Sequence, residues 1–565
     1  MDEFAPRASR LREVPEHTLS EPDALLANIL AARGVKSDAD RSLDLANLAP
    51  LGQLSGLMQA AELIAKHRDG RVLIVGDFDA DGATSTALML RCLSAFGFAH
   101  VDFLVPNRFE FGYGLSAELV AVAEQMQPSL IVTVDNGISS VAGVAAARGV
   151  GIDVVVTDHH LPPDVLPDAN VIVNPNLVGD PYPSKMLAGV GVAFAVMSAV
   201  ARVLDNPSLH RVPAQYLDLV ALGTVADVVP LDRNNRILVN AGLERINAGQ
   251  CCVGISALLS IAGRDTRNVR AADFGFSVAP RLNAAGRLED MSLGIRCLAT
   301  DNAAEARLLA EQLHSINLQR RDIEATMQAE AVEAIELSDA ETRSCEVLFH
   351  RDWHQGVVGL VASRIKDRVH RPVFAFAVES AGQLKGSGRS VPGVHLRDVL
   401  AEVDRTVPGI MIKFGGHAMA AGLTLNGNAI DEFRDALDAA MTRLYPGFEF
   451  DPAFEIDGAL DRDRLSIVFA DRLAALGPWG QRFPEPLFEG TFTVEHARIV
   501  GSRHLKLNLS CDEQQIDGIA FGQARDALPQ PGDRVDLIYR LDVNEWRGTR
   551  RPQLLIEQWQ PAATC

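Results

Sequence analysis

The sequence predicts an α/β protein with a parallel β-sheet, a long connecting helix, a second α/β domain and a C-terminal antiparallel β-barrel. Three observations carry this prediction. Short apolar segments alternate with helical ones between residues 70 and 230, which is typical of a parallel sheet. Residues 302–340 form a long helical pattern without Gly or Pro. Beyond Pro446 the apolar segments become short and alternating, as in a small barrel.

The length of 565 residues and the hydrophobic content of 47% allow several buried cores. We divide the chain into a helical N-terminal segment (1–50), a catalytic domain (51–310), a connecting helix (311–342), a second α/β domain (343–446) and a barrel domain (447–565).

The composition predicts a cytoplasmic protein without a membrane anchor. The first twelve residues have mixed charges, and no apolar segment is long enough to span a bilayer. The seven cysteines are scattered, so we expect reduced thiols. The formal net charge of −20 disfavours a polyanionic partner on average. Acids that hold metal ions would add negative charge that the ions offset locally.

The first strand is expected at residues 71–75, and three carboxylates follow it in Asp77-Phe78-Asp79-Ala80-Asp81-Gly82. Open α/β sheets bind ligands at the carboxyl ends of their strands. Converging carboxylates repel one another unless a cation lies between them, and hard divalent ions prefer oxygen ligands. The alternative is a solvated turn that caps the next helix.

Three further acidic sites follow apolar segments: Asp135 after residues 130–134, Asp158-His159-His160 after residues 154–157, and Asp227 after residues 219–225. Parallel strands bring such positions together at one edge of the sheet. Oxygen-rich sites with one or two imidazoles suit Mn²⁺ or Mg²⁺ better than zinc. A pair of these ions can activate water and stabilise both oxygens in phosphoryl displacement. The pattern therefore predicts a phosphoester hydrolase with two divalent metal ions.

These acidic motifs, with Asp135-Asn136-Gly137 and Asp158-His159-His160, resemble those of the DHH phosphoesterase superfamily. The resemblance extends from about residue 45 to the C-terminus. Over this length the chain is similar to the branch of the superfamily that degrades single-stranded DNA. It is carried further by Val105-Pro106-Asn107-Arg108, Ala221-Leu222-Gly223-Thr224-Val225-Ala226-Asp227, Pro280-Arg281-Leu282-Asn283-Ala284-Ala285-Gly286-Arg287, Trp353-His354-Gln355-Gly356 and Phe414-Gly415-Gly416-His417.

The resemblance implies a DHH domain, a DHHA1-like second domain and an OB-like barrel. It also implies two metal sites. One ion would be bound by Asp77, Asp79 and Asp135, and the other by Asp81, Asp135, His159 and Asp227. Asp135 would bridge the ions and His160 would lie beside the scissile phosphate. Asp158 would support a neighbouring imidazole.

The resemblance further implies nucleic-acid or phosphate contacts at Arg108, Arg281, Asn283, Ser387, Arg389, Gly416 and His417. From the residues alone, each has a plain structural alternative. Arg108 could pair with Glu110, the segment 281–287 could pack a helix end, and Lys385 to Ser390 could form a hairpin turn. The glycines before His417 could make a tight turn.

The barrel would bind single strands through cations and stacking aromatic rings. Its candidates are Arg534, Arg540, Arg547, Arg550 and Arg551, with Tyr539 and Trp546 among them, extended by Arg503 and Lys506. The alternative is a solvated strand face.

The resulting hypothesis is a metal-dependent exonuclease that hydrolyses single-stranded DNA 5′→3′ to 5′-mononucleotides in DNA repair and recombination. We expect a monomer that can work with a helicase and a single-strand-binding protein. Two alternatives remain: a phosphodiesterase of short oligoribonucleotides or cyclic dinucleotides, and a noncatalytic single-strand-binding scaffold. Retention of all the proposed metal ligands argues against the scaffold.

Overall fold

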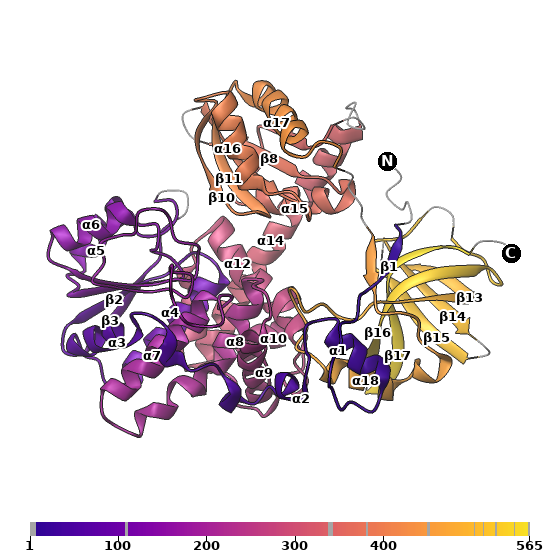
Figure 1. Ribbon diagram of the computed structural model, residues 1–565, viewed down its shortest axis with the longest axis horizontal. Helices are drawn as coiled ribbons and strands as arrows, with labels where there is room; N and C mark the ends of the chain where they lie inside the picture. The colour runs from indigo at the N-terminus through magenta and orange to yellow at the C-terminus, as the bar shows by residue number, and fades with distance from the viewer. Residues whose placement is uncertain are drawn as a thin grey trace. The chain divides into compact units, whose positions relative to one another are not determined.

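A computed structural model describes residues 7–107, 111–336, 343–379, 382–448, 453–501, 503–511, 514–525, 528–546 and 548–562. The chain forms two compact units (Figure 1). The larger comprises Leu11–Asn317 and Glu455–Cys565, and the smaller comprises Met1–Arg10 and Leu318–Phe454. Among the described residues, no helix combines the length and the apolar character needed to cross a membrane.

The larger unit contains a five-stranded parallel sheet of order β3-β2-β4-β5-β6. Apart from Arg71 and Thr133, its central strands β2 and β4 carry apolar residues on both faces, and all of their residues except Arg71 are buried, as expected for a sheet covered on both sides. The strands are β2 (Arg71–Val75), β3 (His100–Leu104), β4 (Leu130–Val134), β5 (Asp153–Thr157) and β6 (Val171–Val173).

Alternate residues of β2 belong to different cores. Val72 and Ile74 pack in the cluster that contains α3 (Leu57–Lys66), α4 (Ala80–Ala95) and α7 (Gly189–Val203). Leu73 and Val75 pack against α5 (Ala117–Gln125) and α6 (Val141–Gly149) on the other face. Figure 1 shows α5 and α6 on the side of the sheet opposite to α3 and α7.

Helices follow the sheet. Residues 219–225, whose sequence pattern fits either a strand or a helix, belong to a helix, so Asp227 follows the end of a helix. The helical segments of this part are α8 (Leu217–Ala226), α9 (Arg233–Asn247), α10 (Val253–Ile261), α11 (Ala271–Asp273), the π-helix η5 (Phe274–Val278), α12 (Ala279–Leu288), α13 (Ser292–Ala299), η3 (Leu209–Arg211) and η4 (Pro213–Tyr216).

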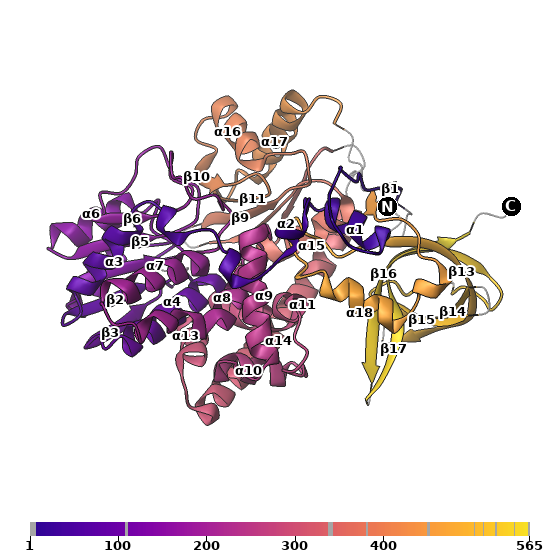
Figure 2. The ribbon, with the colours of Figure 1, turned by 60° about the horizontal axis from the view of Figure 1, so that its bottom comes forward.

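The barrel is closed in the order β13-β14-β15-β17-β16. Its strands are β13 (Phe488–Val500), β14 (His504–Cys511), β15 (Gln514–Ala520), β16 (Arg534–Trp546) and β17 (Thr549–Pro561). Figure 2 shows α18 (Ile467–Ala475) lying along the barrel, where Arg550 pairs with Asp471.

The N-terminal segment packs between the barrel and the sheet domain. Arg33, after α1 (Ala24–Ala31), forms two bonds of 2.7 and 2.9 Å to Asp457, and both side chains are almost fully buried. Arg236 of α9 lies over the ring of Phe483 at 4.2 Å. Apolar residues of both parts share one cluster, so the barrel is a built-in part of this unit. The remaining short helices here are α2 (Asp38–Arg41), η1 (Leu45–Asn47), η2 (Leu51–Gln53) and η8 (Arg462–Arg464).

The smaller unit is built on a mixed sheet of order β10-β11-β9-β8-β7. Phe374 and Phe376 of β8 pack against α16 and α17 on one face. The strands are β7 (Glu346–Phe349), β8 (Val373–Val378), β9 (Gln383–Arg389), β10 (Met411–Gly416) and β11 (Ala420–Asn426), and the helices are α15 (Val358–Val369), α16 (Leu396–Thr406) and α17 (Ile430–Leu444).

A single long helix, α14 (Ala303–Glu336), joins the sheet domain to this smaller unit, as the connecting-helix prediction requires. Two short strands, β1 (Ser9–Leu11) and β12 (Phe454–Ile456), lie where the chain passes between the units. The five-part division of the chain by residue number stays a prediction.

Candidate metal centre

The acidic turn after β2 both caps a helix and gathers carboxylates. Asp79 is the N-cap of α4, and its Oδ1 accepts hydrogen bonds from the amides of Asp81 at 2.9 Å and Gly82 at 3.0 Å. The capping alternative therefore describes Asp79 correctly, but it accounts for only one of that residue's two oxygens. Asp77 is 4% exposed and Asp81 is fully buried, so the turn is not solvated.

Asp81 is held by the first turn of α7. Its Oδ2 accepts from Gly189 N at 2.6 Å and its Oδ1 from Val190 N at 2.9 Å. Burial and the neighbouring Asp79 nevertheless raise the pKa of Asp81 to about 7. This carboxylate needs a nearby cation to remain ionised at neutral pH without cost.

Close approach of α7 to the acids depends on glycine. A Cβ at Gly189 would lie 2.6 Å from Asp135 Cβ and 2.8 Å from Asp135 Oδ1. A Cβ at Gly223 of α8 would lie 2.2 Å from Thr84 Oγ1 and 2.8 Å from Asp81 Oδ1. The two helices thus reach the acids only because these positions carry no side chain.

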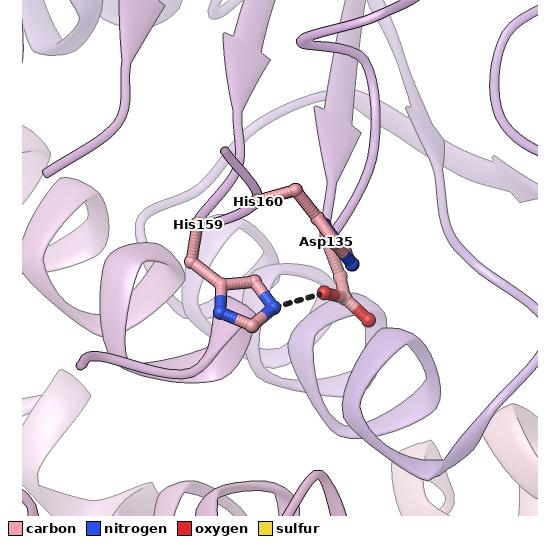
Figure 3. Close-up of side chains that lie close together, drawn as sticks. All are labelled: Asp135, His159 and His160. Atoms are coloured by element: carbon pink, nitrogen blue, oxygen red, sulfur yellow. Dashed lines mark ion pairs between the residues drawn. The ribbon is translucent and has the colours of Figure 1, made fainter. Parts of the chain in front are cut away.

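Asp135 lies at the centre of the cluster, directly after β4, with a backbone φ of 60°. Its Oδ1 lies 3.1 Å from Nε2 of His159, as Figure 3 shows, and the same nitrogen lies 3.4 Å from Asp227 Oδ2. Burial and the charge of Asp81 raise the pKa of both the Asp135 and the Asp227 carboxyls.

The structure brings the predicted ligands into overlapping groups whose ligand atoms lie within 4.8 Å of one another. These groups are Asp77, Asp79 and Asp135; Asp81, His159 and Asp227; and Asp135, His159 and His160. Asp135 Oδ1 and Asp227 Oδ2 are buried and accept no hydrogen bond from the described residues. Mutually repelling carboxylate oxygens with one or two imidazoles fit hard divalent cations.

Asp158 holds the histidine pair and is not in the acidic groups. Its Oδ1 lies 2.7 Å from His160 Nδ1, and its Oδ2 accepts from Ile138 N at 2.9 Å. Burial is the largest single influence on Asp158 and would raise its pKa, but the hydrogen bond and charge of His160, the charge of His159 and the amide of Ile138 together lower the pKa. Burial likewise opposes the charged imidazole, yet Asp158 raises the pKa of His160 to about 9.

Tyr113 is a site residue that sequence reasoning missed. Its hydroxyl donates to the backbone oxygen of Asp135 at 3.0 Å and lies 3.3 Å from His160 Nδ1. Its ring packs edge-on against Phe78 and His160. A tyrosine between Gly112 and Gly114 was the available signal, but nothing in the strand pattern ties that loop to Asp135.

The segment 281–287 lies against the acidic turn. Asn283 Oδ1 accepts from Ala80 N at 2.8 Å, and Arg281 donates to the backbone oxygen of Ser277. A Cβ at Gly286 would lie 1.7 Å from the backbone oxygen of Phe78. Gly286 therefore permits a close approach to the acidic turn at Phe78. Contacts of Arg281 and Asn283 with nucleic acid stay predictions.

Ser387 and Arg389 lie together on β9 of the smaller unit. Buried Gly386 and Gly388 alternate with half-buried Lys385, Ser387 and Arg389 along the strand, so the hairpin-turn alternative is wrong. Arg389 Nη1 donates to Ser387 Oγ at 2.9 Å. A Cβ at Gly359 in the first turn of α15 would lie 2.9 Å from both Ser387 Oγ and Arg389 Nη2.

Gly416 ends β10 with a φ of 140°, and His417 follows in the tight turn to β11, where its amide donates to Ala420 O at 2.8 Å. The structural alternative therefore describes their backbone, and a role toward nucleic acid stays a prediction. Trp353 is 6% exposed and donates to Glu330 at 2.8 Å, so its ring is not a free stacking surface. Arg108 lies outside the described residues.

The predicted basic and aromatic cluster on the barrel is partly wrong. Tyr539 is 1% exposed and belongs to the barrel core, because it alternates in phase with the buried Val535, Leu537 and Leu541 of β16. Arg540 pairs with Glu485 and Glu557. Further cations of the cluster are also neutralised, Arg550 by Asp471 and Lys506 by Asp517, while Arg547 and the Trp546 side chain lie outside the described part.

Comparison with known proteins places this site in a family. Three family models match: the DHH family N-terminal domain at residues 71–224, the DHHA1 domain at 343–443 and the RecJ OB domain at 456–558. The fold and site thus define a DHH phosphoesterase with a DHHA1 domain and an OB barrel.

Curated relatives and a solved structure narrow the class. The single-stranded-DNA-specific exonucleases RecJ of Salmonella typhimurium and Escherichia coli are 49% and 48% identical, each match covering 98% of this chain and 99% of the relative. The crystal structure of RecJ in complex with Mn²⁺ from Thermus thermophilus is 31% identical with a TM-score of 0.79, over 100% of this chain and 81% of that one. The chain belongs to the RecJ family.

Proposed function

We propose that this protein is a metal-dependent exonuclease that hydrolyses the phosphodiester bonds of single-stranded DNA from the 5′ end and releases 5′-mononucleotides. The observation that carries the proposal is the set of converging carboxylates and imidazoles at the sheet edge, in a chain that matches single-stranded-DNA-specific exonucleases over nearly its whole length. The family also supports a role in DNA repair and recombination.

Two divalent ions, Mn²⁺ or Mg²⁺, suit the site. Asp77, Asp79 and Asp135 would hold one, and Asp81, Asp135, His159 and Asp227 the other, with Asp135 as the bridge. When bound, such ions activate water and stabilise the attacking and leaving oxygens. Crystal structures of RecJ from Thermus thermophilus in complex with Mn²⁺ and with Mg²⁺ support this choice of metals.

The chain's own groups prepare the phosphate. Asp158 bonds Nδ1 of His160 at 2.7 Å and supports a positive charge on that ring, so His160 can hold a phosphate oxygen and donate a proton to the leaving oxygen. The two histidines thus have different acidic partners. Asp135 lies beside His159 and would bind the metals, whereas Asp158 bonds the ring of His160.

Selection of the 5′ end would reside in the smaller unit. Ser387 and Arg389 present a hydroxyl and a guanidinium beside the first turn of α15, whose amides favour an anion. Arg108, Arg281, Asn283, Gly416 and His417 are further proposed contacts of the strand. The barrel would bind the strand beyond the cleavage site, through a surface that does not include Tyr539.

The finer biological setting is also proposed: a monomer in the cytoplasm that a helicase or a single-strand-binding protein supplies with substrate. We further propose the five-part division at residues 50, 310, 342 and 446 as the functional one. The match of the RecJ OB domain at residues 456–558 favours this proposal over the alternatives, an oligoribonucleotide or cyclic-dinucleotide phosphodiesterase and a noncatalytic scaffold.

End-labelled DNA tests the function. Purified protein with Mn²⁺ should release labelled mononucleotide from a 5′-labelled single strand at once, whereas a 3′ label should first appear in shortened strands and a matched duplex should persist. Asp135→Asn should abolish release, because the carboxylate at the centre of the cluster is lost. Cleavage of dinucleotides faster than of long strands would favour the oligonucleotide alternative instead.

A further inference from the structure

The backbone of the histidine pair is held entirely by side chains. The amides of His159 and His160 donate to Asp158 Oδ1 at 2.7 and 3.1 Å. Their carbonyl oxygens accept from two asparagines, His160 O from Asn174 Nδ2 at 2.9 Å and His159 O from Asn176 Nδ2 at 2.6 Å. Every backbone polar group of the pair is thus satisfied without a regular strand or helix.

The two asparagines form one unit. Asn174, directly after β6, is fully buried, and its Oδ1 accepts from Asn176 N at 2.7 Å. That bond fixes which end of the Asn174 amide faces its neighbour, so the amino group points to His160 O. Because the donors come from buried or half-buried side chains, losing one leaves a carbonyl without its partner next to the site.

The loop that carries the asparagines is itself anchored. Lys185 Nζ donates to Pro175 O at 2.6 Å and to Asp180 O at 2.7 Å. Asp180 in turn accepts from Ser55 N at 2.8 Å and Tyr182 N at 2.9 Å. The loop therefore cannot shift away from the histidines without breaking several buried bonds.

The same segment touches the opposite side of the acidic cluster. It begins at Asn174 beneath His160 and ends at Gly189 and Val190, whose amides hold the Asp81 carboxylate. Residues 174–190 thus connect the imidazole side of the site with its carboxylate side. A displacement at Asn174 or Asn176 would move the His159 ring relative to Asp135 and Asp227, which lie 3.1 and 3.4 Å from its Nε2.

We propose that Asn174 and Asn176 are positioning residues that set the two histidine rings for metal binding and for hydrolysis. They touch neither the acids nor the phosphate and act through the His159 and His160 carbonyls. The inference rests on the proposed metal-dependent exonuclease function and assigns to these two side chains a part of its metal affinity. Supporting contacts of this kind are worth 10–100-fold in metal affinity or activity, on the order expected here.

The test uses the full chain with Asn176→Asp and Asn174→Asp, which keep the shape of the side chain, replace the amide donor by a carboxylate oxygen and add one negative charge. Asn170→Asp is the matched control: its side chain lies before β6 and bonds Val154 N and Asp153, away from the histidines. The readouts are the melting temperature with and without Mn²⁺ in the absence of DNA, the Mn²⁺ concentration for half-maximal hydrolysis, kcat and KM.

Asn176→Asp and Asn174→Asp should need about 10–100-fold more Mn²⁺, both for thermal stabilisation and for hydrolysis. Their KM for single-stranded DNA at saturating Mn²⁺ should match that of the Asn170→Asp control. Variants that bind Mn²⁺ like the control would overturn the proposal, even if they melt earlier without metal. If Asn174→Asp fails to fold, the half-buried Asn176→Asp decides.

The two hypotheses fail differently. A wild-type protein without Mn²⁺-dependent hydrolysis would contradict the proposed function. An active wild-type protein whose Asn176→Asp variant keeps its Mn²⁺ midpoint would contradict only the positioning role.

Discussion

At the scale of single residues, the acidic cluster stores electrostatic repulsion that a metal relieves. Asp81, Asp135 and Asp227 are deeply buried, and each has a raised pKa caused first by burial and then by a neighbouring acid. A pair of histidines alone does not balance these charges. The centre is therefore costly to keep ionised until cations bind.

This repulsion predicts a pH dependence of stability. The pKa of Asp81 is about 7 in the folded protein, whereas an unfolded aspartate has a pKa of about 3.9. Between these values the folded state holds a proton that the unfolded state has released, so the free energy of unfolding falls as pH rises. Urea unfolding in EDTA should therefore show lower stability at pH 7 than at pH 4.5, and Mn²⁺ should restore the loss at pH 7.

Asp81→Asn provides the control, since an amide cannot ionise. The difference in stability between wild type and this variant should shrink or change sign as the pH rises in EDTA. A difference that is constant from pH 4.5 to 7 would mean that Asp81 titrates normally.

The site residues that the sequence predicts correctly are those that directly follow a strand with a regular apolar pattern. Asp135 and Asp158 directly follow strands whose apolar pattern is plain, and parallel strands leave few options for where their ends lie. Tyr113, Asn174 and Asn176 lie in loops, whose paths depend on tertiary bonds and not on periodicity. The surface cluster wrongly included Tyr539, because this ring is in phase with Val535, Leu537 and Leu541, whose alternation already places it in the barrel core.

At the scale of secondary structure, helix starts bring backbone amides to the site. In the first turn of α7 the amides of Gly189 and Val190 donate to the Asp81 carboxylate, and the close approach of the helix requires a glycine at position 189. Periodicity locates such a helix well, but it does not show which acid the helix meets. Gly189 lies 54 residues after Asp135 in the sequence and still further after Asp81, so local sequence does not reveal these contacts.

Gly189→Ala should therefore disrupt the centre. The new Cβ would meet Asp135 within 2.8 Å, so α7 or Asp135 must move and the amides leave Asp81. We expect a loss of Mn²⁺ affinity and of kcat on the order of 100-fold, as for misplaced supporting groups. Mn²⁺-dependent thermal shift and single-turnover hydrolysis measure both.

Gly149→Ala is the matched control, because Gly149 ends α6 and no atom lies within 4 Å of a Cβ built there. It should retain wild-type affinity and rate. Equal behaviour of the two alanine variants would show that the close approach at Gly189 is not needed.

At the scale of the whole molecule, the barrel and the catalytic sheet belong to one unit. The buried ion pair of Arg33 with Asp457 and the ring of Phe483 beneath Arg236 join them, together with a common apolar core. Composition alone marked a change beyond Pro446 and suggested a separable module. The contacts that join it to the sheet domain come from the N-terminal segment through Arg33, from α9 through Arg236 and from the shared apolar core, none of which composition reveals.

Asp457→Ala should consequently destabilise the whole larger unit. It leaves the Arg33 guanidinium, whose side chain is 1% exposed, without its carboxylate, at a cost of about 3–5 kcal/mol. Urea unfolding followed by tryptophan fluorescence, to which Trp479 beside Arg33 contributes, measures this loss. Asp461→Ala is the control, since that side chain is 81% exposed and its pair with Arg464 should contribute little.

The pairing of Arg33 with Asp457 also has a consequence for biosynthesis. The two residues are 424 positions apart, so Arg33 leaves the ribosome long before its partner has been made. At roughly 5–20 residues per second the delay is on the order of 20–90 s. During translation the first helix therefore waits beside an unfinished sheet domain, and the catalytic unit closes only when its last domain emerges.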